Sequence, residues 1–336
     1  MNHELLPILQ NKYHGAQDKH LNNFNGKIFS KFHKPYLVEP REMCENDYEY
    51  RQGTTGGMKN EEFTHSFRLS SRLSNRFTSH CFTDIKININ KKKYLEFTKT
   101  DFFMVEVEVG GQRIDRTYDI TQLEMNLLLH GEKIEEDEEN ITFSVVCFEN
   151  IYPTFLLIHH EIIIRIITKQ VIGREEIKLI GKAYWHEDRE RITHAPVEYY
   201  CIQTQFCGKQ QITKGTNEIS LYFNHPVFMV YFYGIDKSKL INYKLVLDDV
   251  ILYDSANNNT LQSNDFSMNG KVTNISFTEP LDLTNIYGNK TINFSRIDKP
   301  KLIIETEQET GNIYAVGMNI GIIRVMSGML GLAFSK

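Results

Sequence analysis

The feature that most constrains this chain is a succession of short segments with the two-residue period of β-strands. In Phe103–Val109 apolar residues alternate with two glutamates, so one side of the segment suits a core and the other suits water. Gly110 and Gly111 follow directly, and a Gly-Gly loop permits the positive φ angles of a tight hairpin. We therefore predict an antiparallel hairpin in which residues 111–120 form the partner strand.

The same pattern continues to the end of the chain, with turns of glycine, asparagine, aspartate or proline between apolar runs. Further strands are predicted at residues 141–148, 155–168, 197–206, 218–223, 227–235, 243–253, 271–279, 291–297, 300–307 and 312–320. No segment of helical period is longer than about three turns, and residues 186–192 are expected to form a short helical connector. Many short strands at this spacing indicate an all-β sandwich or jelly roll.

The composition fits a folded protein that does not bind nucleic acid directly. Apolar residues make up 41% of the 336 residues and the net charge is −5, which argues against a broad basic face. The five cysteines are scattered without a CxxC pair, which is unlike a disulfide framework and indicates a reducing compartment. The first residues lack the basic and apolar regions of a signal peptide, so secretion is not expected.

Two apolar stretches approach membrane length, residues 152–167 and 314–334. Histidines and charged residues interrupt the first, and the second contains Asn319 and Arg324. A spanning helix needs about 20 uninterrupted apolar residues, and a central arginine costs roughly 2.5 kcal/mol or more. We expect a buried strand and an apolar tail at these places, with a membrane anchor as the alternative.

No motif of a catalytic or metal site stands out. The consecutive His159, His160 and Glu161 alternate faces if they lie on a strand, so they cannot all face one ion. The sequence contains no GxxxxGK[ST] phosphate loop and no GxSxG elbow. We therefore predict that the protein is not an enzyme and has no metal or cofactor.

Several segments, in chain order, carry a family resemblance. They are Tyr13–Tyr36 with GAQD, Val105–Tyr118 with GGQ and ID, Tyr152–Ile166 with His160-Glu161, Ala183–Phe206, Phe223–Val227, Ser276–Asp298 and the carboxyl-terminal stretch 289–336. Together they resemble the double jelly-roll major capsid proteins of nucleocytoplasmic large DNA viruses, over nearly the whole chain. This chain is shorter than usual members, and the missing length falls in loops of both rolls.

The resemblance implies two tandem eight-stranded antiparallel jelly rolls with an N-terminal arm and short connecting helices. The arm would span residues 1–25, the first roll 26–190, and the second roll with its apolar tail 191–336. Three chains would form a homotrimeric, pseudo-hexagonal capsomer, and capsomers would tile the icosahedral shell of a large double-stranded DNA virus. The implied location is the virion capsid, assembled in the host cytoplasm.

The implied partners are other copies of the chain, minor capsid proteins and the surface of an inner membrane. We expect the arm to contact the partners beneath the capsomer. The tail after Arg324 contains methionines and glycines, which adapt to irregular grooves. We expect this tail to lie against the first roll or a neighbouring subunit, with its own core as the alternative.

Seven residues are candidates for assembly contacts. They are Gly110, Gly111, Arg113 and Asp115 in the hairpin, Arg296 and Asp298 in an SRID motif, and Arg324 before the tail. Arg296 and Asp298 are expected to share a strand face, where paired charges could fix a domain or subunit contact. A role in fold stability alone is the alternative for each candidate.

Two other functions remain open. The short loops suggest a minor capsid or scaffold protein of the same fold, and copy number in virions would separate it from a major capsid protein. A jelly-roll carbohydrate-binding module is the remoter alternative. That function would need exposed aromatic platforms in loops, whereas the loops here are rich in asparagine, aspartate and lysine.

Overall fold

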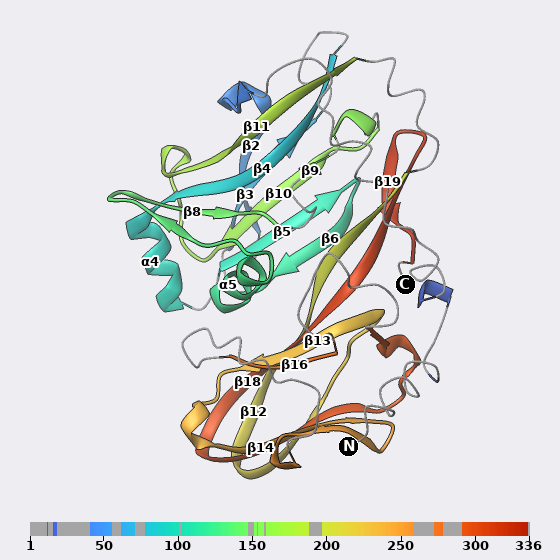
Figure 1. Cartoon of the computed structure of the whole chain (residues 1–336). Helices are drawn as coiled ribbons and strands as arrows, with labels where there is room; N and C mark the ends of the chain where they lie inside the picture. The colour runs from blue at the N-terminus through green and yellow to red at the C-terminus, as the bar shows by residue number, and fades with distance from the viewer. Residues whose placement is uncertain are drawn as a thin grey trace. The chain divides into compact units, whose positions relative to one another are not determined.

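The chain forms two compact units in a computed structural model (Figure 1). The structure describes residues 12, 16–18, 41–55, 62–70, 78–100, 103–146, 151–152, 154–157, 159–187, 197–257, 272–277 and 291–334. We call the described residues of Gly26–Gln203 and Ile322–Lys336 the first roll. Those of Met1–Asn25 and Thr204–Gly321 are the second roll.

The first roll is a sandwich of two antiparallel sheets. One sheet has the order β1-β11-β4-β8-β7 with β9 beside β4, and the other has the order β2-β3-β10-β5-β6. The strands are β1 (Arg41–Glu42), β2 (Glu49–Thr55), β3 (Glu62–Leu69), β4 (Thr78–Asn90), β5 (Phe103–Val109), β6 (Gln112–Thr117), β7 (Glu135–Glu136), β8 (Asn140–Ser144), β9 (Ile151–Tyr152), β10 (Ile162–Thr168) and β11 (Ile177–Glu187). Because β1, β7 and β9 have only two residues each, eight longer strands remain in the described part of this sandwich.

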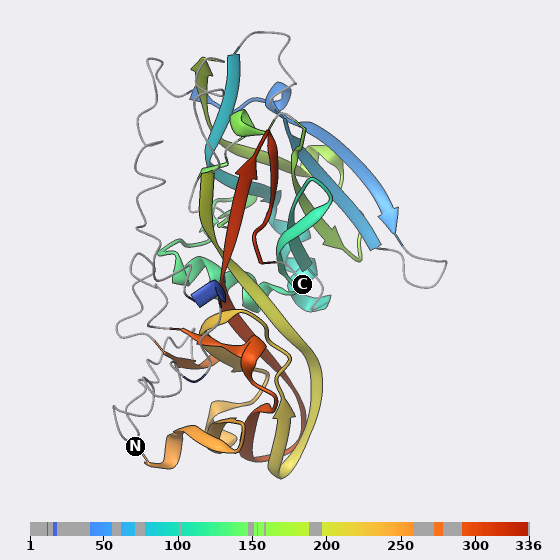
Figure 2. The ribbon, with the colours of Figure 1, turned by 90° about the vertical axis from the view of Figure 1, so that its right-hand side faces the viewer.

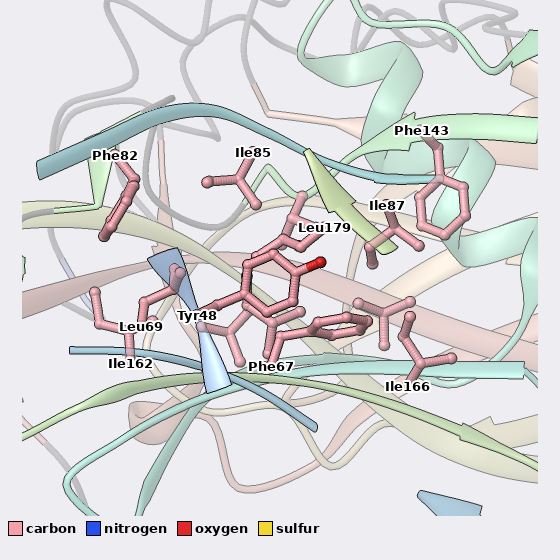
Figure 3. Packing of buried hydrophobic residues seen from close by; sticks show 14 of the residues in the cluster. Tyr48, Phe67, Leu69, Phe82, Ile85, Ile87, Phe143, Ile162, Ile166 and Leu179 are labelled. Atoms are coloured by element: carbon pink, nitrogen blue, oxygen red, sulfur yellow. The ribbon is translucent and has the colours of Figure 1, made fainter. Parts of the chain in front are cut away.

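The core of the first roll lies between these sheets. Figure 3 shows Phe82, Ile85 and Ile87 of β4 opposite Phe67 of β3 and Ile166 of β10. All five side chains are at most 1% exposed. Successive side chains of a strand point to opposite faces, so about every second residue reaches this core. The two-residue period of the sequence thus corresponds to burial between two sheets.

Two helices connect strands of the first roll. α4 (Lys91–Thr100) follows β4 directly and places Phe97 in the core. α5 (Ile120–Leu129) begins after Asp119, whose carboxylate accepts a hydrogen bond from the Gln122 amide at 2.9 Å. A carboxylate at this position satisfies an amide that has no partner within the helix. Each helix has ten residues, in keeping with the short connecting helices that were predicted.

The second roll is built from a single bent sheet. Its order is β15-β14-β18-β13-β16, with β12 beside β18 and β17 beside β13. The strands are β12 (Val197–Ser220), β13 (Pro226–Tyr233), β14 (Leu240–Leu247), β15 (Val250–Asp254), β16 (Val272–Ser276), β17 (Ile292–Asn293) and β18 (Pro300–Met326). Phe232 of β13 and Leu245 of β14 share one buried cluster with Ile304 of β18, so the sheet folds around a common core.

β18 explains how one sheet encloses this core. β14 pairs with residues 300–306 of β18, whereas β13 pairs with residues 314–319. Figure 1 shows β18 curving between these two parts. Segments 300–307 and 312–320, predicted as separate strands, are therefore one continuous strand. A strand that bends in this way can serve both sides of a sandwich.

The compact units divide the chain differently from the predicted domains. The boundary falls at residues 203/204 rather than 190/191, and residues 322–336 join the first roll rather than the second. The reason is that the end of β18 leaves the second roll and buries Ile323 and Val325 in the core of the first. Most of the predicted arm at 1–25, and residues 188–192 of the predicted connector, lie outside the described residues; residues 186–187 end β11.

Two predicted strands are partly wrong. In segment 155–168, Thr154–Leu156 is a 3-10 helix and β10 begins only at Ile162. In segment 291–297, the two residues of β17 are followed by a 3-10 helix at Phe294–Arg296. In the first segment the His160 side chain bonds to Leu330, and in the second the Asn293 side chain bonds to Asp18. Such side-chain contacts compete with the hydrogen-bond ladder of a regular strand.

Both apolar stretches of near-membrane length contain strands. β10 accounts for the end of the first, and β18 with β19 (Met329–Leu332) accounts for most of the second. Within the described ranges, the helices are too short or too polar to cross a membrane.

Candidate assembly site

The predicted hairpin at Gly110 and Gly111 is confirmed. Val109 pairs with Gln112, so the loop has two residues, and both glycines have positive φ angles of 58° and 81°. A Cβ atom at Gly110 would lie 2.3 Å from Nδ1 of His160. Gly111 is therefore needed for its backbone conformation, whereas Gly110 also leaves room for an imidazole ring.

The end of the chain lies against this turn. We use "tail hairpin" for Ile323–Leu332, which comprises the end of β18, a turn at Ser327 and Gly328, and β19. Figure 2 shows β19 running back along β18. The amide of Leu332 donates a hydrogen bond to Oε1 of Gln112 at 2.9 Å. The residue after the Gly-Gly turn thus contacts the tail hairpin directly.

The outer edge of β19 is closed by polar groups of the first roll. The amide of His159 donates to the carbonyl of Gly328 at 3.0 Å. Nδ1 of His160 lies 3.1 Å from both the amide nitrogen and the carbonyl oxygen of Leu330. Alternate residues of a strand present their backbone groups to one edge, so these contacts and that of Gln112 cover consecutive sites along it. An edge covered in this way is not free to pair with another chain.

Apolar side chains of the tail hairpin complete the core of the first roll. Ile323, Val325 and Leu330 are at most 6% exposed and belong to the same buried cluster as the sheet residues. Each fully buried side chain of this kind contributes about 1.5–3 kcal/mol. Met326 and Met329, beside the turn, are each 48% exposed. The expected contact of the tail with the first roll is confirmed.

Arg324 pairs with an acidic residue of a distant segment. Its Nε donates to Oε1 of Glu198 at 2.6 Å. The Glu198 side chain is 14% exposed and that of Arg324 is 41% exposed, so the carboxylate is the more buried partner. Glu198 lies near the start of β12, in one of the segments that resemble capsid proteins. Whether Arg324 also takes part in assembly stays a prediction.

Arg113 and Asp115 lie on β6, beside a network of charges that the sequence analysis missed. Glu106 of β5 is 5% exposed and pairs across the sheet with Arg116 and Arg165. Its carboxylate accepts from Nε of Arg116 at 2.7 Å and from Nη1 of Arg165 at 3.0 Å. A buried carboxylate needs such partners. The sequence pattern that could have predicted this network is the alternation of glutamates in β5, which pair in register with arginines of β6.

A second set of contacts binds the GAQD motif to the second roll. Nε2 of Gln17 donates to the carbonyl of Ile320 at 3.0 Å, and Oε1 of Gln17 lies 3.0 Å from Nδ1 of His225. Nδ2 of Asn293 donates to Oδ2 of Asp18 at 2.7 Å. Gln17, Asp18 and Asn293 are all at most 6% exposed. Four segments of the resemblance therefore contribute to one polar cluster, in which Gln17, Asp18 and Asn293 are buried.

Arg296 and Asp298 do not share a strand face, contrary to the prediction. Arg296 ends a 3-10 helix, Asp298 follows in a loop, and both are exposed. A 3-10 turn has three residues per turn and breaks the two-residue period on which the expectation rested. Asp248 accepts hydrogen bonds from the amides of Asp298 and Lys299 at 3.0 and 2.9 Å, so the backbone of the motif makes the contact here.

Two histidines, the fully buried His65 and the half-buried His130, have a lowered pKa. His65 of β3 is fully buried, and this burial lowers its pKa to about 4. Its Nδ1 lies 2.8 Å from the hydroxyl of Tyr50, while Nε2 has no hydrogen-bond partner among the described residues. Burial also lowers the pKa of His130 to about 4. In the part of the chain that the structure describes, no three His, Cys, Asp or Glu side chains come together as metal ligands.

Comparison with solved structures gives the fold. No family model matches the sequence, and no curated protein matches it. The chain is similar to the double jelly-roll capsid protein VP54 of PBCV-1, as fitted into a reconstruction of the virophage Sputnik. The identity is 18% and the TM-score 0.58, and the alignment covers 91% of this chain and 100% of that chain.

The quasi-atomic structure of the PBCV-1 virus capsid gives a similar result. The identity is 17% and the TM-score 0.57, again with 91% of this chain and 100% of that chain covered. At such low identity the likeness concerns the fold. The chain therefore has the double jelly-roll fold of viral capsid proteins.

Proposed function

We propose that this chain is a structural capsid protein of a large double-stranded DNA virus. It forms homotrimeric, pseudo-hexagonal capsomers, and these tile an icosahedral shell. The observation that carries the proposal is the match to PBCV-1 VP54, which covers 91% of this chain and 100% of that chain in a single alignment. The alternative function, a single jelly-roll carbohydrate-binding module, would explain only one of the two rolls in this chain.

The contacts of the chain ends support a building-block role. A shell protein must remain folded at high local concentration without pairing through open strand edges. In the first roll, the outer edge of β19 is covered by His159, His160 and Gln112. Association is then left to side-chain surfaces, which can be specific for one geometry. On this proposal the protein has no catalytic role.

The proposed partners are other copies of the chain in the capsomer and in the lattice, and minor capsid proteins or an inner membrane surface beneath the shell. The location is the virion capsid, assembled in the host cytoplasm. Arg113, Asp115, Arg296 and Asp298 remain candidates for these contacts because they lie at or near the surface.

The mass of the purified chain in solution tests this proposal. Light scattering after size exclusion should give about three times 39.3 kDa, and electron microscopy of the same peak should show pseudo-hexagonal particles. A monomer that does not assemble under mild conditions contradicts the capsomer. Trimers that occur at low copy number in virions would instead indicate a minor capsid protein.

A further inference from the structure

The first roll contains a small cavity beside β2, the strand at one edge of its five-stranded sheet. The cavity has a volume of about 230 Å³. Its lining comes from β2, β3, the start of β11 and two 3-10 helices, Glu45–Asp47 and Arg174–Glu176. Pockets for drug-sized molecules have about 300–1,000 Å³, so this cavity has room for a single ring.

Three aromatic side chains, those of Tyr48, Tyr50 and Phe67, form most of the apolar part of the lining. The ring centroid of Phe67 lies 5.5 Å from that of Tyr48 and 5.4 Å from that of Tyr50. Figure 3 shows the rings of Tyr48 and Phe67 close together. Nδ1 of His65 lies 2.8 Å from the Tyr50 hydroxyl, which fixes that ring as well. The cavity therefore has a preformed aromatic surface.

Exposed charged side chains form the rim of the cavity. They are Glu45, Arg174, Glu175 and Lys178. None of these side chains makes a hydrogen bond or an ion pair with another described residue, although the Arg174 guanidinium lies over the Tyr50 ring at 5.8 Å from its centroid. On the outer face of the same sheet, by contrast, Arg165 is paired with Glu106. Donors and acceptors of both signs are thus available to a ligand at this rim.

Both 3-10 helices that carry the rim are held by side-chain hydrogen bonds. The Asp47 carboxylate accepts from the amide of Cys44 at 2.8 Å and from Nη1 of Arg41 at 2.6 Å. Oε2 of Glu176 accepts from the amide of Gly173 at 2.6 Å. Because these bonds fix the backbone of both turns, little backbone freedom is lost when a ligand binds.

We propose that this cavity binds a neutral sugar ring, one hexopyranose of a glycan. A pyranose has an apolar C–H face, which suits the aromatic surface, and hydroxyl groups around its edge. Each hydroxyl both donates and accepts, so it can accept from Arg174 or Lys178 and donate to Glu45 or Glu175. Because the two positive and two negative charges of the rim balance, a ligand of net charge gains no advantage over a neutral one. Glycan binding is a property beyond the proposed role in the shell.

Titration of the full-length protein with monosaccharides tests the site. Glucose, galactose, mannose and N-acetylglucosamine are each added at millimolar concentration, and binding is measured by saturation-transfer NMR and calorimetry. At least one of them should bind. Arg174→Gln should weaken this binding about tenfold, because hydrogen bonds from a charged donor are lost. Arg51→Gln makes the same charge change on the opposite face of β2 and should leave the affinity unchanged.

A second pair of variants tests the aromatic surface. Tyr50→Leu removes the ring and should weaken sugar binding about fivefold. Tyr50→Phe keeps the ring but loses the hydroxyl that contacts His65, and it should bind the sugar as the original protein does. Thermal unfolding shows that each variant is folded before its affinity is compared. Glycans released from host cells and from purified virions are titrated separately, and the set that binds identifies the source of the sugar.

Three results would overturn the sugar site. They are a folded protein that binds none of the four sugars, binding that neither Arg174→Gln nor Tyr50→Leu weakens, and binding of a zwitterion such as phosphocholine in place of the sugars. The mass of the same sample keeps this test apart from the proposed function. Trimers that bind no sugar contradict the site alone, and a monomer that binds sugar contradicts the capsomer alone.

Discussion

At the scale of single residues, the structure places buried and half-buried polar side chains where they bond to particular backbone groups or to one another. His160 meets Leu330, Gln17 meets Ile320, and Asn293 meets Asp18. An unsatisfied buried polar group costs about 1–3 kcal/mol, so each of these side chains favours one arrangement of the backbone over others. His65 is different, because its Nε2 atom is buried without a partner among the described residues.

Acid should destabilise the protein through His65. Its folded-state pKa is about 4 and its ordinary value is 6.5, so between these values the unfolded chain binds a proton that the folded chain excludes. The free energy of unfolding should fall by up to about 3 kcal/mol as pH drops from 6.5 to 4. Urea unfolding across this range measures the fall. A His65→Gln variant should show a shallower fall; His130, whose pKa burial also lowers, and Asp47 and Asp254, whose pKa values are despite burial lowered by their partners, should contribute to the rest of the fall. An unchanged slope contradicts the assignment.

The Arg324–Glu198 pair should contribute modestly to stability. Because Arg324 is 41% exposed, solvent screens the pair, and we expect a coupling energy of about 1 kcal/mol or less. Arg324→Gln should cost more than Glu198→Gln, because it leaves a mostly buried carboxylate without its partner. A double-mutant cycle from urea unfolding measures the coupling. If Arg324 acts only at subunit contacts, the monomer's stability will be insensitive to both changes.

At the scale of elements, turn chemistry and side-chain contacts decide where strands begin and end. Gly110 and Gly111 close the β5–β6 hairpin, and two aspartates with positive φ, Asp248 and Asp249, close the β14–β15 hairpin. β10 begins later than its apolar sequence predicts, at Ile162. The residues just before it are used to cover β19, so the strand could not extend there without losing those contacts.

The two glycines of the first hairpin should differ in their tolerance of alanine. Gly111→Ala should cost about 1–2 kcal/mol, because its φ of 81° is unfavourable for an L-residue but its surroundings are open. Gly110→Ala should cost more, because the new Cβ atom also displaces His160. Thermal unfolding of both variants gives the comparison. Adding His160→Ala should recover part of the extra loss at Gly110, and no recovery would mean that the ring is not the obstacle.

At the scale of the whole molecule, each roll includes a segment from the far end of the chain. Gln17 and Asp18 lie in the second roll, whose other residues begin at Thr204, and the tail hairpin lies in the first roll. The core of the first roll includes side chains from the C-terminal end of the chain. Folding of the first roll should therefore depend on residues near 330, and contacts of such long sequence separation slow folding.

Truncation of a tail side chain should weaken the first roll. Leu330→Ala removes a side chain that is 3% exposed and should cost about 2–5 kcal/mol. Met329→Ala, at a neighbouring position that is 48% exposed, should change stability by about 0.5 kcal/mol or less. Hydrogen exchange of amides in β5 and β6 reports the loss in the first roll. Equal effects of the two substitutions would show that the hairpin does not hold this core.

The sequence by itself determined the features that depend on near neighbours. The two-residue period predicted the strands, paired glycines predicted the hairpin at Gly110, and the ordered motifs predicted the double jelly roll. The first two predictions succeed because backbone conformation and side-chain direction are local properties, whereas the third rests on the family resemblance. The likeness to PBCV-1 VP54 then confirmed the fold across 91% of the chain.

Only the tertiary structure decided which distant segments meet. His160 and Leu330 are 170 residues apart, and Gln17 and Ile320 are 303 apart, so no local pattern connects them. For the same reason the predicted domain bounds grouped residues 322–336 with the second roll, although contact of the tail with the first roll was expected, and Arg296 with Asp298 was predicted as a pair on one strand face. At such places long-range burial and hydrogen bonding outweigh local conformational preference. A short chain end cannot offset the entropy lost on ordering by itself, but it gains free energy when its apolar side chains are buried in a core formed by distant segments.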